Sequence, residues 1–124
     1  MKFYQCKKCK KIVGMIQNSA CPTMCCGEEM VEMKAGESDG ATEKHVPVVH
    51  VDGKTVTVEV GSVAHPMQED HWIQWVALET QKGMQRKVLN PGEEPKVCFA
   101  LTDDDAPVSV YEYCNLHGLW KTDV

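Results

Sequence analysis

Hydrophobic and polar positions alternate with a period near two from residue 46 onward. The runs VPVVHV (46–51) and KTVTVEV (54–60) flank Asp52-Gly53, and a two-residue Asp-Gly between β-branched runs predicts a β-hairpin. The segment HWIQWVALET (71–80) has no helical stripe and is rich in aromatic and β-branched residues, so we expect a strand there. Turn-rich segments, NPGEEP and TDDDAP, separate further short runs that we also expect to be strands: 84–89, 96–101 and 108–114.

Short strands at this spacing predict an all-β fold, an antiparallel sandwich or barrel. The first 33 residues break the pattern, because they contain five of the seven cysteines and few apolar positions. That is too little hydrophobic area for an independent core, so we expect this segment to need a metal or a partner to fold. The Gly-, Ser- and Asp-rich stretch KAGESDGAT (34–42) indicates a linker, which predicts two domains, 1–36 and 37–124.

Composition narrows the class of protein. The net charge of -5 argues against a duplex nucleic-acid binder, which neutralises phosphates with Lys and Arg. No stretch approaches the roughly 20 apolar residues of a membrane span, and the start, MKFYQCKKCKK, lacks the apolar core of a secretory signal. We therefore expect a soluble, cytoplasmic protein. Since the cytosol keeps thiols reduced and the number of cysteines is odd, metal binding explains them better than disulfides.

Four of the cysteines form a first candidate metal site. Cys6 and Cys9 make a C-x2-C knuckle, and Cys25 and Cys26 follow as an adjacent pair. Four thiolates at this spacing predict a tetrahedral all-sulfur site for zinc or a single iron, with a thiol redox pair as a third interpretation. Neighbouring residues on a strand point to opposite faces, so the adjacent pair requires a sharp turn. Cys21 lies outside the pattern and has no assigned role.

Lysines surround the knuckle, at positions 7, 8, 10 and 11. They are compatible with a solvated loop. They are equally compatible with cations that offset a net negative metal-thiolate centre and steer a redox partner.

A second set of candidate ligands lies in the rest of the chain. Four of the five histidines are expected in loops or at strand ends, where sandwich scaffolds carry function. We exclude His50, inside a strand run, and we expect Cys98, inside KVCFAL, to be a buried small hydrophobe. The remaining candidates are His45, His65, His71, Cys114 and His117.

Three longer motifs, EKHVPVVHV (43–51), GSVAHPMQEDHWIQW (61–75) and EYCNLHGLWK (112–121), together with C-x2-C-x15-C-C, closely resemble desulfoferrodoxin, the two-iron class of superoxide reductase. The resemblance covers nearly the whole chain. It implies a small desulforedoxin- or rubredoxin-like metal knot followed by an immunoglobulin-like antiparallel β-sandwich.

The resemblance also implies two mononuclear iron sites. The first would have Cys6, Cys9, Cys25 and Cys26 as ligands. The second would have four histidines in an equatorial plane and a cysteine as the axial ligand: His45, His65, His71, His117 and Cys114. Glu43 and Lys44 fall where the family has a mobile pair beside an open iron position.

Five protein ligands are one too many for tetrahedral zinc but suit octahedral iron with one vacant position. The implied activity is one-electron reduction of superoxide to hydrogen peroxide at ferrous iron, without dioxygen production, for detoxification in an anaerobe or microaerophile. The implied partners are a rubredoxin-like electron donor and a second copy of the chain in a homodimer. A two-zinc structural module, a two-iron electron carrier and a superoxide dismutase are the alternatives.

Overall fold

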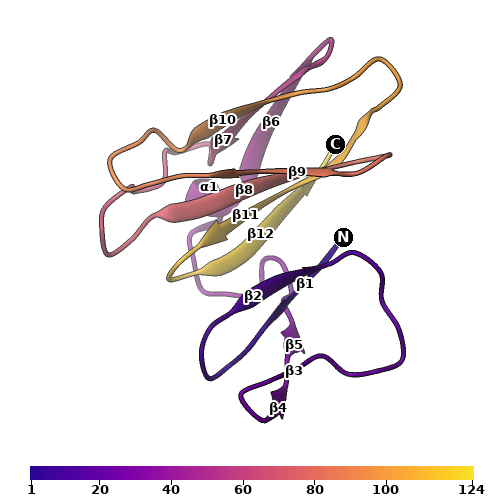
Figure 1. The fold of residues 1–124 in the computed structure, drawn as a ribbon. Helices are drawn as coiled ribbons and strands as arrows, with labels where there is room; N and C mark the ends of the chain where they lie inside the picture. Colours follow the sequence, from indigo (N-terminus) through magenta and orange to yellow (C-terminus); the bar gives the residue numbers. More distant parts are fainter. The chain divides into compact units, whose positions relative to one another are not determined.

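The computed structural model describes residues 1–124, and the chain divides into two compact units, Met1–Lys34 and Ala35–Val124. Both units consist of β-strands, and the one helix, α1 (Thr42–His45), is a single turn (Figure 1). The predicted all-β class is therefore confirmed. This short helix is far from the length and hydropathy that a membrane-spanning helix needs.

The smaller unit contains two small antiparallel sheets. One has the strand order β2-β1-β5 and the other pairs β3 with β4. Its buried apolar side chains are limited to Phe3, Cys6 and Met30, as expected for a segment that lacks a core of its own. The strands are β1 (Lys2–Gln5), β2 (Ile12–Met15), β3 (Met24–Cys25), β4 (Glu28–Glu29) and β5 (Val31–Glu32).

The larger unit is an antiparallel β-sandwich of the immunoglobulin-like type. One sheet has the order β10-β7-β6 and the other β12-β11-β8-β9. The strands are β6 (Pro47–Asp52), β7 (Thr55–Val60), β8 (Ile73–Thr80), β9 (Met84–Val88), β10 (Lys96–Ala100), β11 (Pro107–Cys114) and β12 (Gly118–Asp123). The runs expected at 71–80, 84–89, 96–101 and 108–114 are confirmed as strands, whereas β12 and the strands of the smaller unit were not predicted.

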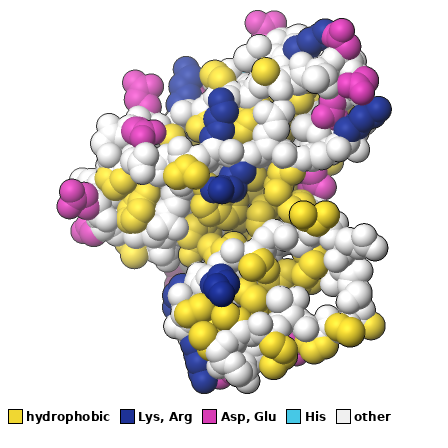
Figure 2. All heavy atoms as spheres, viewed as in Figure 1, with side chains coloured by type: hydrophobic (Ala, Val, Ile, Leu, Met, Phe, Trp, Pro, Cys, Tyr) yellow, Lys and Arg dark blue, Asp and Glu magenta, His cyan; other side chains and the backbone are white.

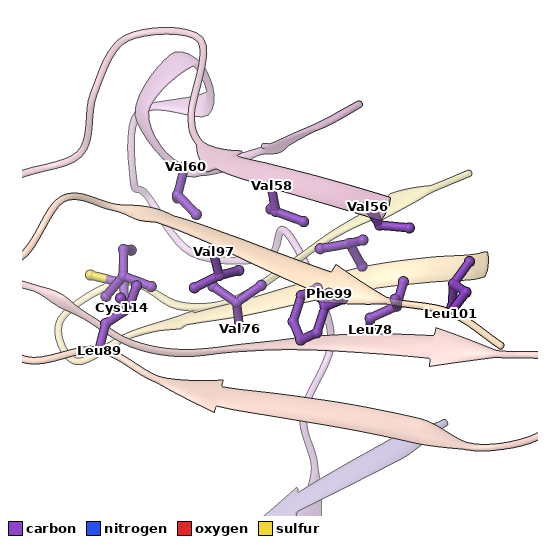
Figure 3. Close-up of a cluster of buried hydrophobic side chains, with 12 residues drawn as sticks. Val56, Val58, Val60, Val76, Leu78, Leu89, Val97, Phe99, Leu101 and Cys114 are labelled. Carbon is purple, nitrogen blue, oxygen red and sulfur yellow. The ribbon is translucent and has the colours of Figure 1, made fainter. Parts of the chain in front are cut away.

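Alternating side chains from the two sheets form the core. Along β7 the buried positions are Val56, Val58 and Val60, and Phe99 of β10 and Leu78 of β8 lie in the same cluster (Figure 3). Burial of these side chains provides the main stabilisation of the sandwich. Cys114 belongs to the cluster and lies at one of its ends.

The predicted hairpin is present, but its loop is shifted by one residue. Asp52 pairs with Thr55, so the two loop residues are Gly53 and Lys54 instead of Asp52 and Gly53. Gly53 has φ +59°. A type II′ turn places glycine at this first loop position, which explains why the chain turns one residue later than expected.

The expectation for Cys98 was wrong, because its side chain is exposed. The alternation along β10 sends the larger neighbours Val97 and Phe99 into the core and Cys98 to the opposite face. There its Sγ lies 3.5 Å from Oγ1 of Thr57 on the adjacent strand β7.

Candidate metal centres

Three separate chain segments bring five potential ligands together in the larger unit. His45 is the last residue of α1, His65 and His71 lie in the loop between β7 and β8, Cys114 ends β11, and His117 lies in the following turn. One ligand atom from each lies within 4.8 Å of every other. We call these five residues the five-ligand cluster. His45, His65 and Cys114 are buried, and His71 and His117 are partly buried.

The four imidazole rings of the cluster lie at the corners of a square. In the order His45, His65, His71, His117, neighbouring ring centroids are 4.6, 4.7, 5.1 and 4.8 Å apart, and neighbouring planes meet at 72° to 87°. The opposite rings His45 and His71 are 6.5 Å apart, close to the diagonal of about 6.8 Å that such a square has. A square of nitrogen donors is the equatorial arrangement of a tetragonal or octahedral metal site.

Backbone hydrogen bonds fix the tautomers of two of these rings. Nδ1 of His45 lies 2.7 Å from the carbonyl oxygen of Ala41, and Nδ1 of His65 lies 2.6 Å from that of Pro66. A carbonyl only accepts, so each Nδ1 carries the proton, and each Nε2 presents a lone pair. This is the usual orientation of a metal-binding histidine.

The two nitrogens that carry these lone pairs are close together. The Nε2 atoms of His45 and His65 are 3.1 Å apart. Two metal–nitrogen bonds of about 2.1 Å that meet at a right angle would hold their nitrogens about 3.0 Å apart. The spacing therefore fits two neighbouring ligands of one metal ion.

The other members of the cluster also fit a metal. Nε2 of His71 is buried and has no hydrogen-bond partner, which is unusual for a buried polar atom. Sγ of Cys114 lies 3.9 Å from Nδ1 of His117. A cation at the centre would satisfy these atoms together.

Burial favours the neutral form of three histidines in the cluster. It lowers the pKa of His65 to about 4, although the hydrogen bond to Pro66 opposes this. Burial also lowers the pKa of His45 and of His71, and the charge of His117 adds to both effects. Neutral imidazole is the form that binds metal.

Cys114 differs from the histidines because it binds a metal in its charged form, the thiolate. Burial raises the pKa of its thiol, while the backbone N–H groups of His117 and Leu116 lower it. A buried thiol of this kind ionises readily only beside a positive charge. The site is therefore built for a cation.

Three residues that the sequence did not single out support the cluster. A Cβ at Gly40 would lie 2.9 Å from Cβ of His117 and 2.9 Å from Cε1 of His45. Trp120 stacks on His45, with centroids 5.0 Å apart and planes at 27°, and its Nε1 donates to the carbonyl oxygen of His117 at 3.0 Å. Ser38 also donates to that oxygen.

Asn115, inside the CNLHG motif, ties two of the segments together. Its Nδ2 donates to the carbonyl oxygen of Asp70, and its Oδ1 accepts from the N–H of Trp72, both at 2.9 Å. These bonds flank His71 on both sides. The turn that carries Cys114 and the loop that carries His71 are thereby held in register.

Glu43 and Lys44 precede His45 on α1 and are both exposed. The charge of Lys44 contributes to lowering the pKa of His45 and of His71, so its ammonium group is close enough to affect the cluster. The backbone of Glu43 is fixed by the N–H of Val63, which donates to its carbonyl oxygen at 2.9 Å.

The smaller unit holds a second cluster, formed by Cys6, Cys9, Cys25 and Cys26. We call it the four-cysteine cluster. Sγ of Cys25 lies 3.6 Å from Sγ of Cys9 and 3.9 Å from Sγ of Cys26. Ligands of a tetrahedral site with metal–sulfur bonds of about 2.3 Å are about 3.8 Å apart, so these distances fit one metal.

A tight turn brings the adjacent cysteines to one side. Cys25 pairs with Glu28, and the loop residues Cys26 and Gly27 have φ of 52° and 75°. Two positive φ angles are typical of a type I′ turn. The expected sharp turn is therefore confirmed.

The thiols of the four-cysteine cluster do not all ionise with equal ease. The N–H of Cys9 donates to Sγ of Cys6 at 3.4 Å and is the main reason that the pKa of Cys6 is lowered to about 6. Competition with the other thiols, Cys9 first, raises the pKa of Cys26 to about 12. Cys21 and Cys98 belong to neither cluster.

Comparison with known proteins identifies the family. The sequence profile of the desulfoferrodoxin family matches residues 37–123. The desulfoferrodoxin of Nitratidesulfovibrio vulgaris is 46% identical over 97% of this chain and 94% of its own length. The desulfoferrodoxin homologue of Archaeoglobus fulgidus is 43% identical over 98% of this chain and 96% of its own length.

Solved structures agree with the sequence matches. The superoxide reductase from Treponema pallidum has a TM-score of 0.82 and 43% identity, and the match covers 98% of each chain. A superoxide reductase from Giardia intestinalis, described as 1Fe-SOR, has a TM-score of 0.57 and 32% identity over 66% of this chain and 97% of its own. The second match leaves about a third of this chain uncovered.

The resemblance seen in the motifs is thus confirmed at the level of sequence and fold. The two donor sets, four cysteines in one and four histidines with a cysteine in the other, are consistent with two mononuclear iron centres, as expected. Because the family profile covers most of the larger unit and full-length relatives exceed 40% identity, the chain belongs to the desulfoferrodoxin family.

Proposed function

We propose that the protein is a superoxide reductase, in which the five-ligand cluster binds one iron ion through four histidines and one axial cysteine. One superoxide, one electron and two protons give one hydrogen peroxide, and no dioxygen is released. The observation that carries the proposal is the square of four imidazole rings with a buried thiol beside it. The similarity to structures described as superoxide reductases supports it.

The donor set suits this reaction. Five protein ligands leave the sixth position of an octahedral iron open for a small molecule. Four neutral imidazoles and one thiolate leave a net charge of about +1 with a ferrous ion, which attracts a small anion even though the protein is acidic overall. The bound ferrous ion would supply the electron.

Lys44 is proposed to attract superoxide and to supply protons through an ordered water. It is exposed, it adjoins the buried ligand His45, and its charge affects the pKa of two cluster histidines. A compact ammonium group on a flexible stem suits both tasks.

Glu43 is proposed to occupy the open position of the iron in the five-ligand cluster when that iron is oxidised, and to leave it when the iron is reduced. Its carboxylate is exposed, whereas its backbone is held by Val63. The motion would therefore be confined to the side chain.

Cys114 is proposed to act as the axial thiolate, opposite the open position. Backbone N–H groups of Leu116 and His117 stabilise its charge. A thiolate in this position raises the electron density on iron, as in thiolate-ligated haem enzymes, and so favours electron transfer to superoxide.

The four-cysteine cluster is proposed to bind the other iron through Cys6, Cys9, Cys25 and Cys26. A rubredoxin-like carrier would return the protein to the ferrous state, and the iron of this cluster either relays the electron or holds the small unit together. The end of the first unit at Lys34 and the start of the family profile at residue 37 support domains at 1–36 and 37–124.

We also propose a cytoplasmic homodimer. The sheets of the sandwich end in the unpaired edges of β6, β9, β10 and β12, and edge strands favour pairing with another chain. Sedimentation equilibrium gives the mass directly. A monomer at micromolar concentration would contradict this proposal.

The function is tested by metal analysis and a superoxide reaction on the same sample. We expect two irons per chain, rapid oxidation of the reduced five-ligand site by superoxide, one peroxide per superoxide consumed and no oxygen evolution. Zinc alone in both sites would favour a structural module. Iron without rapid oxidation would favour an electron carrier, and oxygen evolution would favour dismutation.

A further inference from the structure

The two units of the chain carry opposite net charge. The unit Met1–Lys34 contains six lysines and three glutamates, a net charge of +3. The unit Ala35–Val124 contains seven Lys or Arg and fifteen Asp or Glu, a net charge of -8. A charged protein that approaches this molecule is therefore attracted to one unit and repelled by the other.

The positive charge of the smaller unit is concentrated beside its metal ligands. The lysine knuckle, which we define as Lys7, Lys8, Lys10 and Lys11, is exposed throughout. In Figure 2 dark blue side chains gather along one edge of this unit. Lys8 pairs with Glu28 at 3.6 Å, whereas the other three make no ion pair.

The backbone of the knuckle is fixed. Lys10 N–H donates to the carbonyl oxygen of Cys6, and Cys6 N–H donates to that of Lys11, both at 2.9 Å. Lys10 adopts a left-handed conformation, with φ 67°. The charges are therefore attached to a well-defined loop around the four-cysteine cluster.

Part of the four-cysteine cluster is exposed near the lysine knuckle. Cys9, between the lysines, is exposed, and so is Cys26, whereas Cys6 is buried. Met24, adjacent to Cys25 in sequence, is 58% exposed and provides apolar area near the thiolates. A small apolar contact with a charged rim is typical of brief redox encounters.

We propose that the lysine knuckle and Cys9 form the docking surface for an acidic one-electron carrier protein. One electron passes from the reduced carrier to the ferric ion of the four-cysteine cluster, which becomes ferrous, and no proton is transferred. This inference rests on the proposed function, because the carrier is the reductant that the superoxide reaction requires. The charge of the larger unit directs the carrier away from the sandwich.

A triple variant tests the surface. Lys7→Gln, Lys10→Gln and Lys11→Gln together remove three charges and leave the Lys8–Glu28 pair intact. The matched control, Lys54→Gln, Lys82→Gln and Lys96→Gln, removes the same charge from the larger unit. The probe is a reduced acidic rubredoxin, and stopped-flow absorbance follows reduction of the ferric four-cysteine site over a range of ionic strength.

We expect the triple variant to lose at least tenfold in second-order rate at low salt and to lose most of the salt dependence, whereas the control changes less than twofold. A second readout is binding of the oxidised carrier to zinc-substituted protein, followed by NMR shifts. Equal rates in the variant and wild type would overturn the proposal. Reduction of the five-ligand site before the four-cysteine site would also overturn it.

Two further measurements separate the possible explanations. Oxidation of pre-reduced wild-type protein by superoxide, without carrier, tests the proposed function independently of docking. Sedimentation at low and high salt tests whether a second copy of the chain, through its acidic unit, is the partner. If the triple variant loses a dimer while its rates with the carrier stay unchanged, the lysine knuckle is a dimer contact and the proposal is overturned.

Trp120 on β12 carries an independent inference. Its buried indole touches two neighbouring corners of the square, because it stacks on His45 and donates to the carbonyl oxygen of His117. We infer that Trp120 is a positioning residue, which fixes the ring plane of His45 relative to the turn that carries His117. Such contacts to ligands tune a metal site without touching the metal.

Two variants divide the contacts of Trp120. Trp120→Phe keeps an aromatic face but loses the hydrogen bond, and Trp120→Leu loses both. Trp75→Phe is the control, since Trp75 stacks on Tyr113 instead. We expect the thiolate-to-iron absorption band to shift in Trp120→Phe and to shift further in Trp120→Leu. Iron release to a chelator should become up to about tenfold faster, and the control should show neither change. Wild-type spectra and release rates in both Trp120 variants would overturn the inference.

Discussion

The Nε2 atoms of His45 and His65 lie 3.1 Å apart in a buried site, and each carries a lone pair. Without a cation bound to both nitrogens their lone pairs repel each other, and neither ring protonates readily, since burial lowers the pKa of both. The larger unit is therefore expected to be less stable without its iron.

Removal of iron tests this relationship. We expect chelation to lower the melting temperature of the sandwich by at least about 5 °C, which corresponds to roughly 1 kcal/mol in a domain of this size. Calorimetry of the iron-loaded and chelated protein measures the difference, and added ferrous iron should restore it. Identical melting temperatures would show that the cluster is not strained without metal.

Gly40 provides a sharper test of the same site. Gly40→Ala adds one methyl group that would lie 2.9 Å from atoms of both His45 and His117, so one of the two ligands must move. We expect iron affinity at the five-ligand site to fall about 10- to 100-fold, the cost typical of disturbed ligand support. Competition with a chelator measures it.

Gly83→Ala is the matched control, because nothing lies within 4 Å of a Cβ at that position. Both glycines have φ outside the left-handed region, so alanine is compatible with either backbone. Equal iron affinity in the two variants would show that the cluster tolerates displacement of a ligand.

The role of Gly40 illustrates what the sequence could not predict. It lies in a stretch assigned to the linker, and a side chain there would collide with His45 and with His117, which is distant in the sequence. Only the folded chain brings these segments together. By contrast, the histidine candidates were identifiable, since strand ends and loops follow from the period-two pattern and from turn residues.

The two errors in the sandwich have local causes. A strand pattern shows that successive side chains point to opposite faces of the sheet. The short run at 96–101 does not show which of the two faces lies against the core, so Cys98 was assigned to the wrong face. In the hairpin, Asp52-Gly53 signalled a turn, and the preference of a type II′ loop for glycine at its first position moved that turn by one residue.

Cys9→Ser is expected to separate the two centres. The variant removes one of four thiolates, so metal binding in the smaller unit and its protection from proteolysis should be lost. The five-ligand cluster takes no ligand from this unit, so pre-reduced protein should still react with superoxide at a rate within about twofold of wild type. Limited proteolysis and stopped-flow mixing measure the two effects; a large loss of the superoxide reaction would make the iron of the four-cysteine cluster essential.

Lys44→Ala is expected to slow the reaction with superoxide by about 10²-fold, the lower end of the contribution from a positioned proton donor. Pulse radiolysis on reduced protein measures the rate and its dependence on salt, which should weaken in the variant. Lys82→Ala is the control, since this exposed lysine pairs with Asp104 and does not contribute to the lowered pKa of His45, His65 or His71. Similar rates in the two variants would remove Lys44 from the mechanism.

Cys114→Ser is expected to affect chemistry more than folding. Serine is smaller, and the side chain lies at one end of the core cluster, so the loss of stability should stay near about 1–2 kcal/mol in the metal-free protein. A serine hydroxyl at this buried position does not ionise readily, so the site loses its anionic ligand and the electron density that the ligand provides. We expect the reaction with superoxide to fall by at least about tenfold, with the visible absorption of the oxidised site lost. Denaturant titration of both metal-free proteins separates the two effects, and full activity in a folded, iron-loaded variant would contradict the assignment of Cys114 as the axial ligand.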